Sequence, residues 1–310
     1  MAAKHGVAIL GIFVADLAFR AGRQPAMGET ILGSGFKMGP GGKGSNQAVA
    51  AARAGAKVTF ISALGRDAFG DNAMATWKAE DITPCVVQSD SLPTGAAYIF
   101  VSDETGDNAI IVVPGAAGGI SPADVEAARG AITSAKVFVT QLEQPLPAAM
   151  RGLEIARAAG AITLFNPAPA AALPDALLPL CDYVIPNESE AAGLTGLAVT
   201  TIAEARKAAD VLLKKGAGTA LITLGSRGSL FHDGGQSVLI NPFDAGKVVE
   251  TAGAGDSYVG AFAAALADGM EPLEAARFGS AAAAISVTRP GTAPAMPSRA
   301  EIEHLLVNSR

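Results

Sequence analysis

The sequence predicts an α/β fold, with a doubly wound, mostly parallel sheet, helices on both faces and a small separate β-sheet beside it. From Ser121 onward, short apolar segments alternate with helical patterns, which is typical of a parallel sheet with crossover helices. Half of the 310 residues are hydrophobic and 17% are charged, so a large core can form. Two regions of exposed β pattern, about residues 12–38 and 95–113, stand apart from this alternation. We therefore expect a single domain over 1–310, with those two regions forming the small sheet.

The composition argues against several kinds of partner. The net charge is −6 and no basic run occurs, which argues against nucleic acid. No apolar run approaches the length of a membrane span, so no membrane partner is expected. The two cysteines, Cys85 and Cys181, are too few for a disulfide framework or a metal cluster, and a reducing cytoplasm fits them.

The apolar run Val7–Phe13 is expected to be a buried first strand. A signal peptide is the alternative, because the run follows Lys4 near the start of the chain. Asp16 and Arg20 interrupt the apolar pattern early, which favours the strand. A carboxylate just past a strand end, such as Asp16, is well placed to accept hydrogen bonds from the hydroxyl groups of a ligand. Otherwise it is an ordinary surface residue.

A glycine-rich turn follows the exposed strand expected at Thr30–Met38. Residues 39–44 formally match G-x-G-x-x-G, but no buried apolar strand precedes them, which argues against a dinucleotide site. The turn is not a P-loop either, because Gly44 rather than Ser or Thr follows Lys43. We expect it to bring backbone groups, Lys43 and Asn46 to a small polar ligand. The alternative is a plain turn with a solvated lysine.

The next segments predict a strand, a helix and a hairpin. Lys57–Leu64 is an apolar strand, and the helix after it carries Trp77, which we expect in the core. Ala96–Val101 and Ala109–Val113 flank the polar turn Ser102–Asp107, a pattern typical of a β-hairpin. Together with the exposed strands near the N-terminus, this hairpin is expected to form the small sheet outside the main domain.

Four later strands are followed by polar or glycine-rich residues at their C-terminal ends. These expected strands are Val137–Thr140, Ala161–Phe165, Tyr183–Ile185 and Ala220–Leu224. Ligands of open α/β sheets bind at this edge, so the four ends predict a binding site. Asn187 and Glu190 begin a helical pattern there, share one of its faces, and also fit a capping box.

The segment Val248–Tyr258 carries the most informative pattern. Residues 253–255 are Gly, Ala and Gly, and an Ala-rich run with helical spacing of its apolar residues follows them. The free N–H groups and the dipole at such a helix start stabilise an anion, most often a phosphate. Asp256 would lie beside that anion and is placed to take a proton from a hydroxyl group, as phosphoryl transfer to an alcohol requires. The alternative is that Asp256 only caps the helix.

The run Thr251–Asp256 resembles the signature of the ribokinase-like (PfkB) carbohydrate kinases, in which the aspartate is the catalytic base and the small-residue turn is the anion hole. Other segments match ribokinase-type patterns in the same order: Gly41–Gly55, Gln141–Glu143, Asn166–Ala170, Pro186–Glu190 and Thr223–Gly228. The resemblance implies an ATP-dependent kinase that phosphorylates the primary hydroxyl of a sugar, with D-ribose as the default substrate. It also implies that the small sheet, formed by about 12–38 and 95–113, is a lid that covers the sugar and pairs in a homodimer.

The resemblance assigns roles to residues of this chain. The catalytic set is Asp256 with Gly253, Ala254 and Gly255. The sugar-binding set is Asp16, Gly42, Lys43, Asn46, Glu143 and Asp256. The ATP-binding set is Asn187, Thr223, Gly225, Ser226, Gly228, Gly255 and Ser280. Mg²⁺ is expected through water at Glu190, and a monovalent cation, K⁺, in a shell of Glu250, Ala252, Ser286, Arg289, Gly291 and Ala295.

Three positions depart from the ribokinase pattern. Glu250 stands where Asp is usual, and Ala295 stands where Ser is common, so the cation shell differs. Val14 stands where Asn is usual and cannot hydrogen-bond a sugar hydroxyl. Our hypothesis is that the preferred substrate is not free D-ribose; otherwise Val14 only packs. A nucleoside kinase or a fructokinase-like sugar kinase is the alternative within the family. A sensor without catalysis is a more distant one, against which Asp256 beside an intact turn argues.

Overall fold

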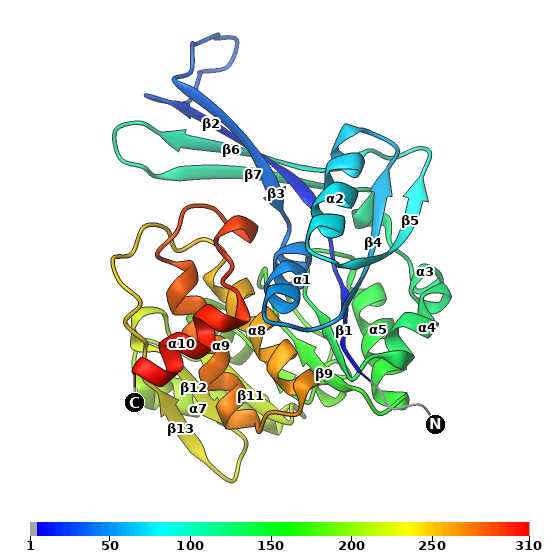
Figure 1. Ribbon diagram of the computed structural model, residues 1–310, viewed down its shortest axis with the longest axis vertical. Helices are drawn as coiled ribbons and strands as arrows, with labels where there is room; N and C mark the ends of the chain where they lie inside the picture. The colour runs from blue at the N-terminus through cyan, green and yellow to red at the C-terminus, as the bar shows by residue number, and fades with distance from the viewer. Residues whose placement is uncertain (1–4, 310) are drawn as a thin grey trace.

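The computed structural model describes residues 5–309, and its centre is one large sheet (Figure 1). The strands of this sheet are β1 (Val7–Leu10), β4 (Val58–Gly65), β5 (Thr83–Ser89), β8 (Val137–Thr140), β9 (Ile162–Phe165), β10 (Tyr183–Val184), β11 (Thr219–Thr223), β12 (Ser229–His232) and β13 (Ser237–Ile240). They form nine strands in the order β13-β12-β11-β10-β9-β8-β1-β4-β5. Pairing is parallel from β11 to β5, whereas β12 and β13 add an antiparallel hairpin. The predicted mostly parallel α/β sheet is confirmed.

Helices bury both faces of the sheet. One face is covered by α1 (Lys43–Arg53), α2 (Ala68–Ala79), α8 (Ala254–Asp268), α9 (Pro272–Ser286) and α10 (Arg299–Asn308). The other is covered by α3 (Pro122–Ala127), α4 (Arg129–Ser134), α5 (Leu146–Ala158), α6 (Glu188–Thr195) and α7 (Ile202–Lys214). In β1, Val7 and Ile9 enter the first core while Ala8 and Leu10 enter the second. A strand buried on both sides has no polar face, which explains its continuous apolar sequence.

Small residues allow α8 to cross α1 closely. A Cβ atom at Gly260 would lie 2.4 Å from the backbone oxygen of Gln47, so a larger residue there would push the two helices apart. Gly260 is one helical turn beyond Asp256, and Gln47 is in the second turn of α1. The close crossing therefore brings the N-terminal turns of the two helices together, where the candidate site lies.

Trp77, on α2, lies in the core beside α1, as predicted. It is fully buried, stacks at an angle on Phe60 and lies edge-on to Phe13. Its indole Nε1–H donates a hydrogen bond to Ser45 Oγ over 3.0 Å. The packing of α2 against the sheet thus also supports the start of α1.

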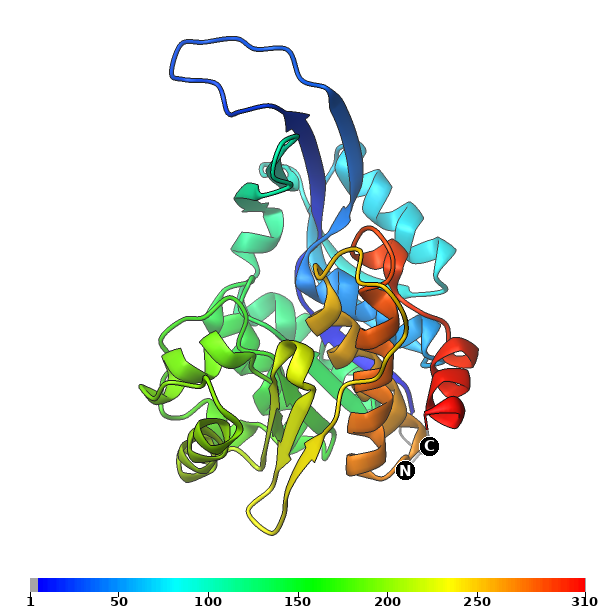
Figure 2. The ribbon, with the colours of Figure 1, turned by 90° about the vertical axis from the view of Figure 1, so that its left-hand side faces the viewer.

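A separate four-stranded sheet projects from the α/β body (Figure 2). Its strands are β2 (Val14–Ala21), β3 (Gly35–Gly41), β6 (Thr94–Ser102) and β7 (Asn108–Gly115), in the order β3-β2-β6-β7. The β6–β7 hairpin forms as predicted. The strand β2 pairs antiparallel with β3 and parallel with β6, so the small sheet is mixed.

Two strand boundaries near the N-terminus differ from expectation. The run Val7–Phe13 is a strand only as far as Leu10, because the chain leaves the main sheet there and enters the lid at Val14. The strand expected at Thr30–Met38 begins later, at Gly35, and continues to Gly41. Apolar character alone did not locate these breaks, since residues 11–13 are buried although they lie outside any strand.

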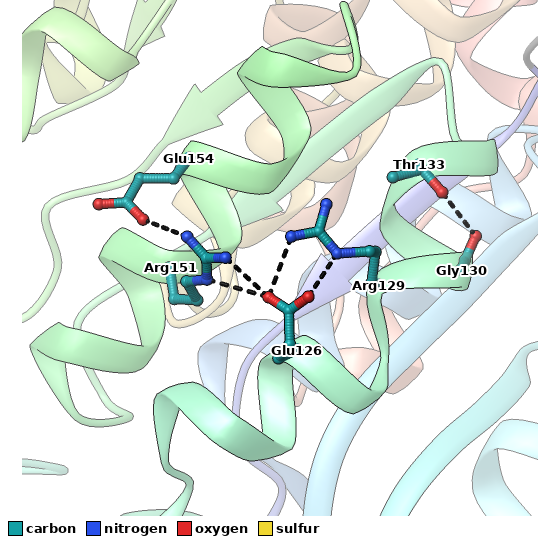
Figure 3. A network of polar contacts seen from close by, with 6 residues as sticks. All are labelled: Glu126, Arg129, Gly130, Thr133, Arg151 and Glu154. Atoms are coloured by element: carbon teal, nitrogen blue, oxygen red, sulfur yellow. Dashed lines mark hydrogen bonds and ion pairs between the residues drawn. The ribbon is translucent and has the colours of Figure 1, made fainter.

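An exposed charge network joins the short helices α3 and α4 to α5 (Figure 3). The carboxylate of Glu126 accepts hydrogen bonds from Arg129 and Arg151, and Arg151 also contacts Glu154. The two arginines hold the pKa of Glu126 at about 2, well below its usual range. Such exposed pairs are screened by solvent, so we assign this network to the surface rather than to the site.

Among residues 5–309, no helix is both long and apolar enough to span a membrane. Cys85 is half-buried and Cys181 is buried, and both are free thiols.

Candidate active site

Asp256 lies in the first turn of α8, held by two amides from α1. The Nδ2 group of Asn46 donates to Asp256 Oδ2 over 3.1 Å, and the Nε2 group of Gln47 donates to Oδ1 over 3.0 Å. Burial raises the pKa of the Asp256 carboxyl, whereas the charge of Lys43 and the two amide bonds act in the opposite direction. The N-cap of α8 is Gly253, with a left-handed φ of 79°, so Asp256 is not the capping residue.

Gln47 is oriented by three partners at once. Besides Asp256, its Nε2 group donates to Asn166 Oδ1 over 3.1 Å, and its Oε1 atom accepts from Gln141 Nε2 over 2.6 Å. Asn166 is fixed in turn, because its Nδ2 group donates to the backbone oxygen of Ile185 over 2.8 Å. These amides follow β8 and β9, so two strand ends of the main sheet set the orientation of Asp256.

Glu143 accepts a hydrogen bond from the N-terminus of α1. Its Oε2 atom accepts a hydrogen bond from the backbone N–H of Lys43 over 2.7 Å. The N-cap residue Gly42 has no side chain to satisfy that group, and its φ of 89° together with a Cβ clash at 2.5 Å from Ile12 O explains why glycine is needed there. Burial raises the pKa of Glu143 to about 7, which the contact with Lys43 partly offsets.

Asp16 lies across the last residue of β3. A Cβ atom at Gly41 would come within 2.3 Å of Asp16 Oδ1, so glycine makes room for the carboxylate. Burial raises the pKa of Asp16 to about 6. The charges of Asp16 and Asp256 both act to raise the pKa of Glu143, which indicates that the three carboxyl groups surround one region.

A cavity of about 150 Å³ opens at the C-terminal edge of the main sheet, next to Asp256. Of the predicted site residues, it is lined by Lys43, Asn187, Glu190, Thr223, Gly253, Gly255 and Asp256. Asn166, Ala168, Ile185 and Val259 also line it and were not assigned a role from the sequence. Their common signal was position, because Asn166, Ala168 and Ile185 lie at or just beyond strand ends and Val259 is one helical turn after Asp256.

The segment at the start of α6 forms a capping box. The backbone N–H of Asn187 donates to Glu190 Oε2 over 2.8 Å, and the N–H of Glu190 donates to Asn187 Oδ1 over 2.8 Å. The capping box expected from the spacing of Asn187 and Glu190 is therefore present. Glu190 also lines the cavity, and burial raises its pKa, with the charge of Asp256 acting in the same direction. One oxygen of the Glu190 carboxylate accepts the hydrogen bond of the cap, and Glu190 lines the same cavity as Asp256.

The predicted ATP loop turns sharply after β11. Gly225 and Gly228 have left-handed φ values of 56° and 90°, and a Cβ at Gly228 would lie 2.0 Å from Ile240 O. Gly225 and Ser226 are exposed beyond the cavity, and Ser280 is buried in α9. These residues, with Gly228, are not among those that line the cavity around Asp256.

The residues of the predicted cation shell lie on two adjoining segments, 250–252 and 286–295. The Glu250 carboxylate accepts a hydrogen bond from Gly291 N–H over 2.8 Å, and the N–H groups of Val249 and Glu250 donate to Val287 O. Ser286 bonds within its own helix, and Arg289 pairs with Glu301. Ala252 is exposed, whereas Ala295 is buried. Among the described residues, no group of three His, Cys, Asp or Glu side chains forms a metal cluster.

A buried carboxylate in the first turn of a helix, a turn of small residues before it and a cavity at the sheet edge are the arrangement expected of a phosphotransferase. Residues 4–299 match the model of the pfkB family of carbohydrate kinases. The chain is 39% identical to the ribokinase of Haemophilus influenzae, over 96% of this chain and 97% of that protein. It is 34% identical to the deoxyribokinase of Salmonella typhimurium, over 97% and 99% of the two chains. The Arabidopsis thaliana ribokinase structure, complexed with ribose and ATP, superposes with a TM-score of 0.91 at 30% identity, covering 98% and 99%.

The chain belongs to the pfkB family of carbohydrate kinases. It is a ribokinase-like sugar kinase, and the predicted family, fold class and type of enzyme are confirmed.

Proposed function

We propose that this protein transfers the γ-phosphoryl group of ATP to the primary hydroxyl of a small sugar, with D-ribose as the default substrate and Asp256 as the base. The observation that carries the proposal is the burial of Asp256 at the N-terminus of α8, beside Lys43 and the turn Gly253–Gly255. A base at this place can take a proton from the acceptor hydroxyl while the end of the helix stabilises the phosphoryl group.

The sugar is held between the lid and the start of α1. The residues proposed to contact it are Asp16, Gly42, Lys43, Asn46 and Glu143. Asp16 and Glu143 supply hydrogen-bond acceptors, and Lys43 and Asn46 supply donors. Asp256 takes the proton of the primary hydroxyl as its oxygen attacks. The N–H groups of Gly253, Ala254 and Gly255 stabilise the negative charge of the transferring phosphoryl group.

ATP is proposed to enter from the sheet edge. The residues proposed to bind it are Asn187, Thr223, Gly225, Ser226, Gly228, Gly255 and Ser280. Glu190 and Asp256 line one cavity, and carboxylate oxygens are the ligands that Mg²⁺ prefers, so the donor set fits a magnesium ion held through water. When bound, Mg²⁺ would neutralise phosphate charge.

Activation by K⁺ is proposed at the shell formed by Glu250, Ala252, Ser286, Arg289, Gly291 and Ala295. The two segments that carry these residues are joined by the Glu250–Gly291 hydrogen bond, so their backbone oxygens are near one another. Oxygen ligands suit a hard cation. Equal initial rates in K⁺ and in tetramethylammonium would show that K⁺ does not activate the enzyme at this site.

We further propose that the protein acts in the cytoplasm as a homodimer joined through the lid. Two free thiols fit a reducing compartment. The lid exposes large apolar side chains on β3 and β7, among them Phe36 and Ile111, which a second lid would cover.

An ATP-coupled assay across pentoses, 2-deoxypentoses, hexoses and nucleosides tests the reaction. We expect ADP release only with a sugar, and a product phosphorylated at its primary hydroxyl, as ³¹P NMR would show. Phosphorylation of nucleosides in preference to free sugars would favour the nucleoside kinase instead. Binding of sugar and ATP without ADP release would favour the non-catalytic sensor.

A further inference from the structure

The loop after α9 is tied to both sides of the proposed active site. On the phosphoryl side, Gly291 N–H donates to Glu250 Oε2 over 2.8 Å, just before the anion-binding turn. On the sugar side, Thr292 Oγ1 donates to the backbone oxygen of Pro40 over 3.3 Å. Pro40 lies near the end of the lid strand β3, two residues before Gly42. Consecutive residues of one loop therefore connect the two sides.

Thr292 also touches the anion-binding turn directly. A Cβ atom at Gly253 would lie 3.2 Å from Thr292 Cα and 3.3 Å from its Cβ, so the two backbones pack against each other there. Gly253 is the N-cap of α8 and sits one residue before the first N–H group of the helix. The hydroxyl of Thr292 thus holds the lid strand while the rest of the residue packs on the turn.

Arg53 anchors the same loop to the far end of α1. Its Nη1 donates to Met296 O over 2.8 Å and to Pro294 O over 3.2 Å. The rest of the guanidinium group pairs with Glu80, through Nε at 2.9 Å and Nη2 at 2.6 Å. The bonds of Arg53 to Met296 and Glu80 are partly buried, whereas its bond to Pro294 is exposed. Arg53 thus fixes the end of the loop, and Thr292 is the loop contact nearest the site.

We infer that Thr292 is a positioning residue that sets the spacing between the sugar-binding turn Gly41–Lys43 and the anion-binding turn Gly253–Gly255. This inference rests on the proposed roles of those two turns. The attacking oxygen and the phosphoryl group come from opposite sides, and small errors in their alignment lower the rate. The link through Thr292 consists of protein groups alone and so differs from the cation shell on the same loop.

Thr292→Val tests the role of the hydroxyl, because valine has nearly the same shape and lacks the donor. Without the hydrogen bond to Pro40, kcat/KM for the sugar should fall about two- to tenfold. The KM for ATP should stay within about twofold, since the hydroxyl that is removed bonds to Pro40, which is not in the proposed ATP-binding set. Hydrogen–deuterium exchange in peptides covering residues 38–47 should become faster in the free protein. Thr292→Ser, which keeps the donor, should restore both the kinetics and the exchange.

Thr288→Val is the matched control. Its hydroxyl donates to Ile285 O, in the last turn of the preceding helix α9, over 2.7 Å and not to the lid strand, so both readouts should match the parent. Parent-like kinetics and exchange in Thr292→Val would overturn the inference, and so would a Thr292→Ser variant as impaired as Thr292→Val. If the parent phosphorylates no sugar, the proposed function fails, and the exchange measurement still decides whether Thr292 holds the lid strand.

Discussion

Single residues around Asp256 act mainly through neutral amides. Asn46 and Gln47 each donate to one oxygen of the carboxylate, and Gln141 and Asn166 fix the amide of Gln47. Amide donors orient a carboxylate without forming an ion pair with it, so it keeps its capacity to accept a proton. Burial raises the pKa of Asp256 in the free protein, which moves it toward the range useful to a general base.

Replacing the base should separate binding from turnover. Asp256→Asn keeps the size of the side chain but cannot accept the proton, so kcat should fall by about 10²–10⁴-fold. Sugar and ATP should still shift the melting temperature, because their other contacts remain. Asp71→Asn, which changes an exposed carboxylate on α2, should leave kcat unchanged. Turnover of Asp256→Asn within a few-fold of the parent would exclude Asp256 as the base.

Val14 is the residue that we propose influences substrate choice. It begins β2, is 3% exposed, and its Cγ1 would lie 2.9 Å from a Cβ at Gly95, so it packs on the neighbouring strand. Asp16 follows two residues later on the same face of the strand. An apolar side chain at this place suits a sugar without a hydroxyl there, and an unpaired buried hydroxyl costs about 1–3 kcal/mol.

Val14→Asn should therefore raise kcat/KM for D-ribose relative to 2-deoxyribose, by about tenfold or more. Val14→Ala is the control, because it enlarges the space without adding a hydrogen-bonding group. The comparison is made with both sugars in the same coupled assay. If the parent already prefers D-ribose to every other sugar or nucleoside and Asn brings no gain, Val14 only packs.

Among the secondary-structure elements, the N-terminus of α1 lowers the free energy of unfolding at neutral pH, because it holds the buried carboxyl group of Glu143. Glu143 has a pKa of about 7 in the folded protein, against 4.5 as its ordinary value, chiefly because it is buried. Between those two pH values the folded state keeps a proton that the unfolded state has released. The free energy of unfolding therefore falls as the pH rises from about 4.5 to about 7.

Glu143→Gln should remove this dependence, since glutamine does not titrate and its oxygen can still accept from Lys43 N–H. At pH 8 the variant should be more stable than the parent by about 1–3 kcal/mol, and the difference should vanish near pH 4.5. Chemical denaturation of the sugar-free protein at several pH values measures it. Glu104→Gln, in the exposed lid turn, should behave as the parent throughout. A gain in stability that is equal at pH 4.5 and pH 8 would contradict the assigned cause.

The sequence located elements best where burial imposes a simple pattern. The four strands that end in polar residues, from β8 to β11, lie where they were expected, because strands buried on both faces are short apolar runs. The edge strand β5 and the β12–β13 hairpin were not predicted. β5 is half exposed and contains Pro84, and β12 and β13 continue past the glycine turn that suggested only a ligand loop.

Some features of the site could not have come from the sequence. The glycine turn, Asp256 and Lys43 form local patterns with a known physical use, and the structure places them on one cavity. The contact of Gln47 with Asp256 joins residues 209 positions apart, and the contact with Asn166 joins residues 119 apart. Such pairs depend on how closely α8 crosses α1, which Gly260 permits and which no local pattern encodes.

In the whole molecule, the lid is where the apolar surface is concentrated. Leu17, Phe19, Phe36, Tyr98 and Ile111 share one face, since residues at paired positions in neighbouring strands lie on the same side. Phe19 contacts the rings of Phe36 and Tyr98, with centroids 4.9 Å and 5.8 Å away. Phe36 and Ile111 remain 62% and 64% exposed. An aromatic and aliphatic face this open is expected to be covered, and a second copy of the same apolar sheet is the partner that we propose.

Phe36→Asp should dissociate the homodimer that we propose. A charge on the apolar face, at the edge strand β3, would have to be buried without a partner in the dimer, which costs far more than the contact it replaces. Sedimentation at micromolar concentration should give a dimer for the parent and a monomer for the variant. Val307→Asp, at a site on α10 that is 66% exposed and far from the lid in sequence, is the matched control and should remain dimeric. A monomeric parent, or a variant that stays dimeric, would show that the lid surface is not the interface. If dissociation also lowers kcat/KM for the sugar, the second lid helps to close the site over it, because the strands that carry Asp16 and Gly41 belong to the same small sheet.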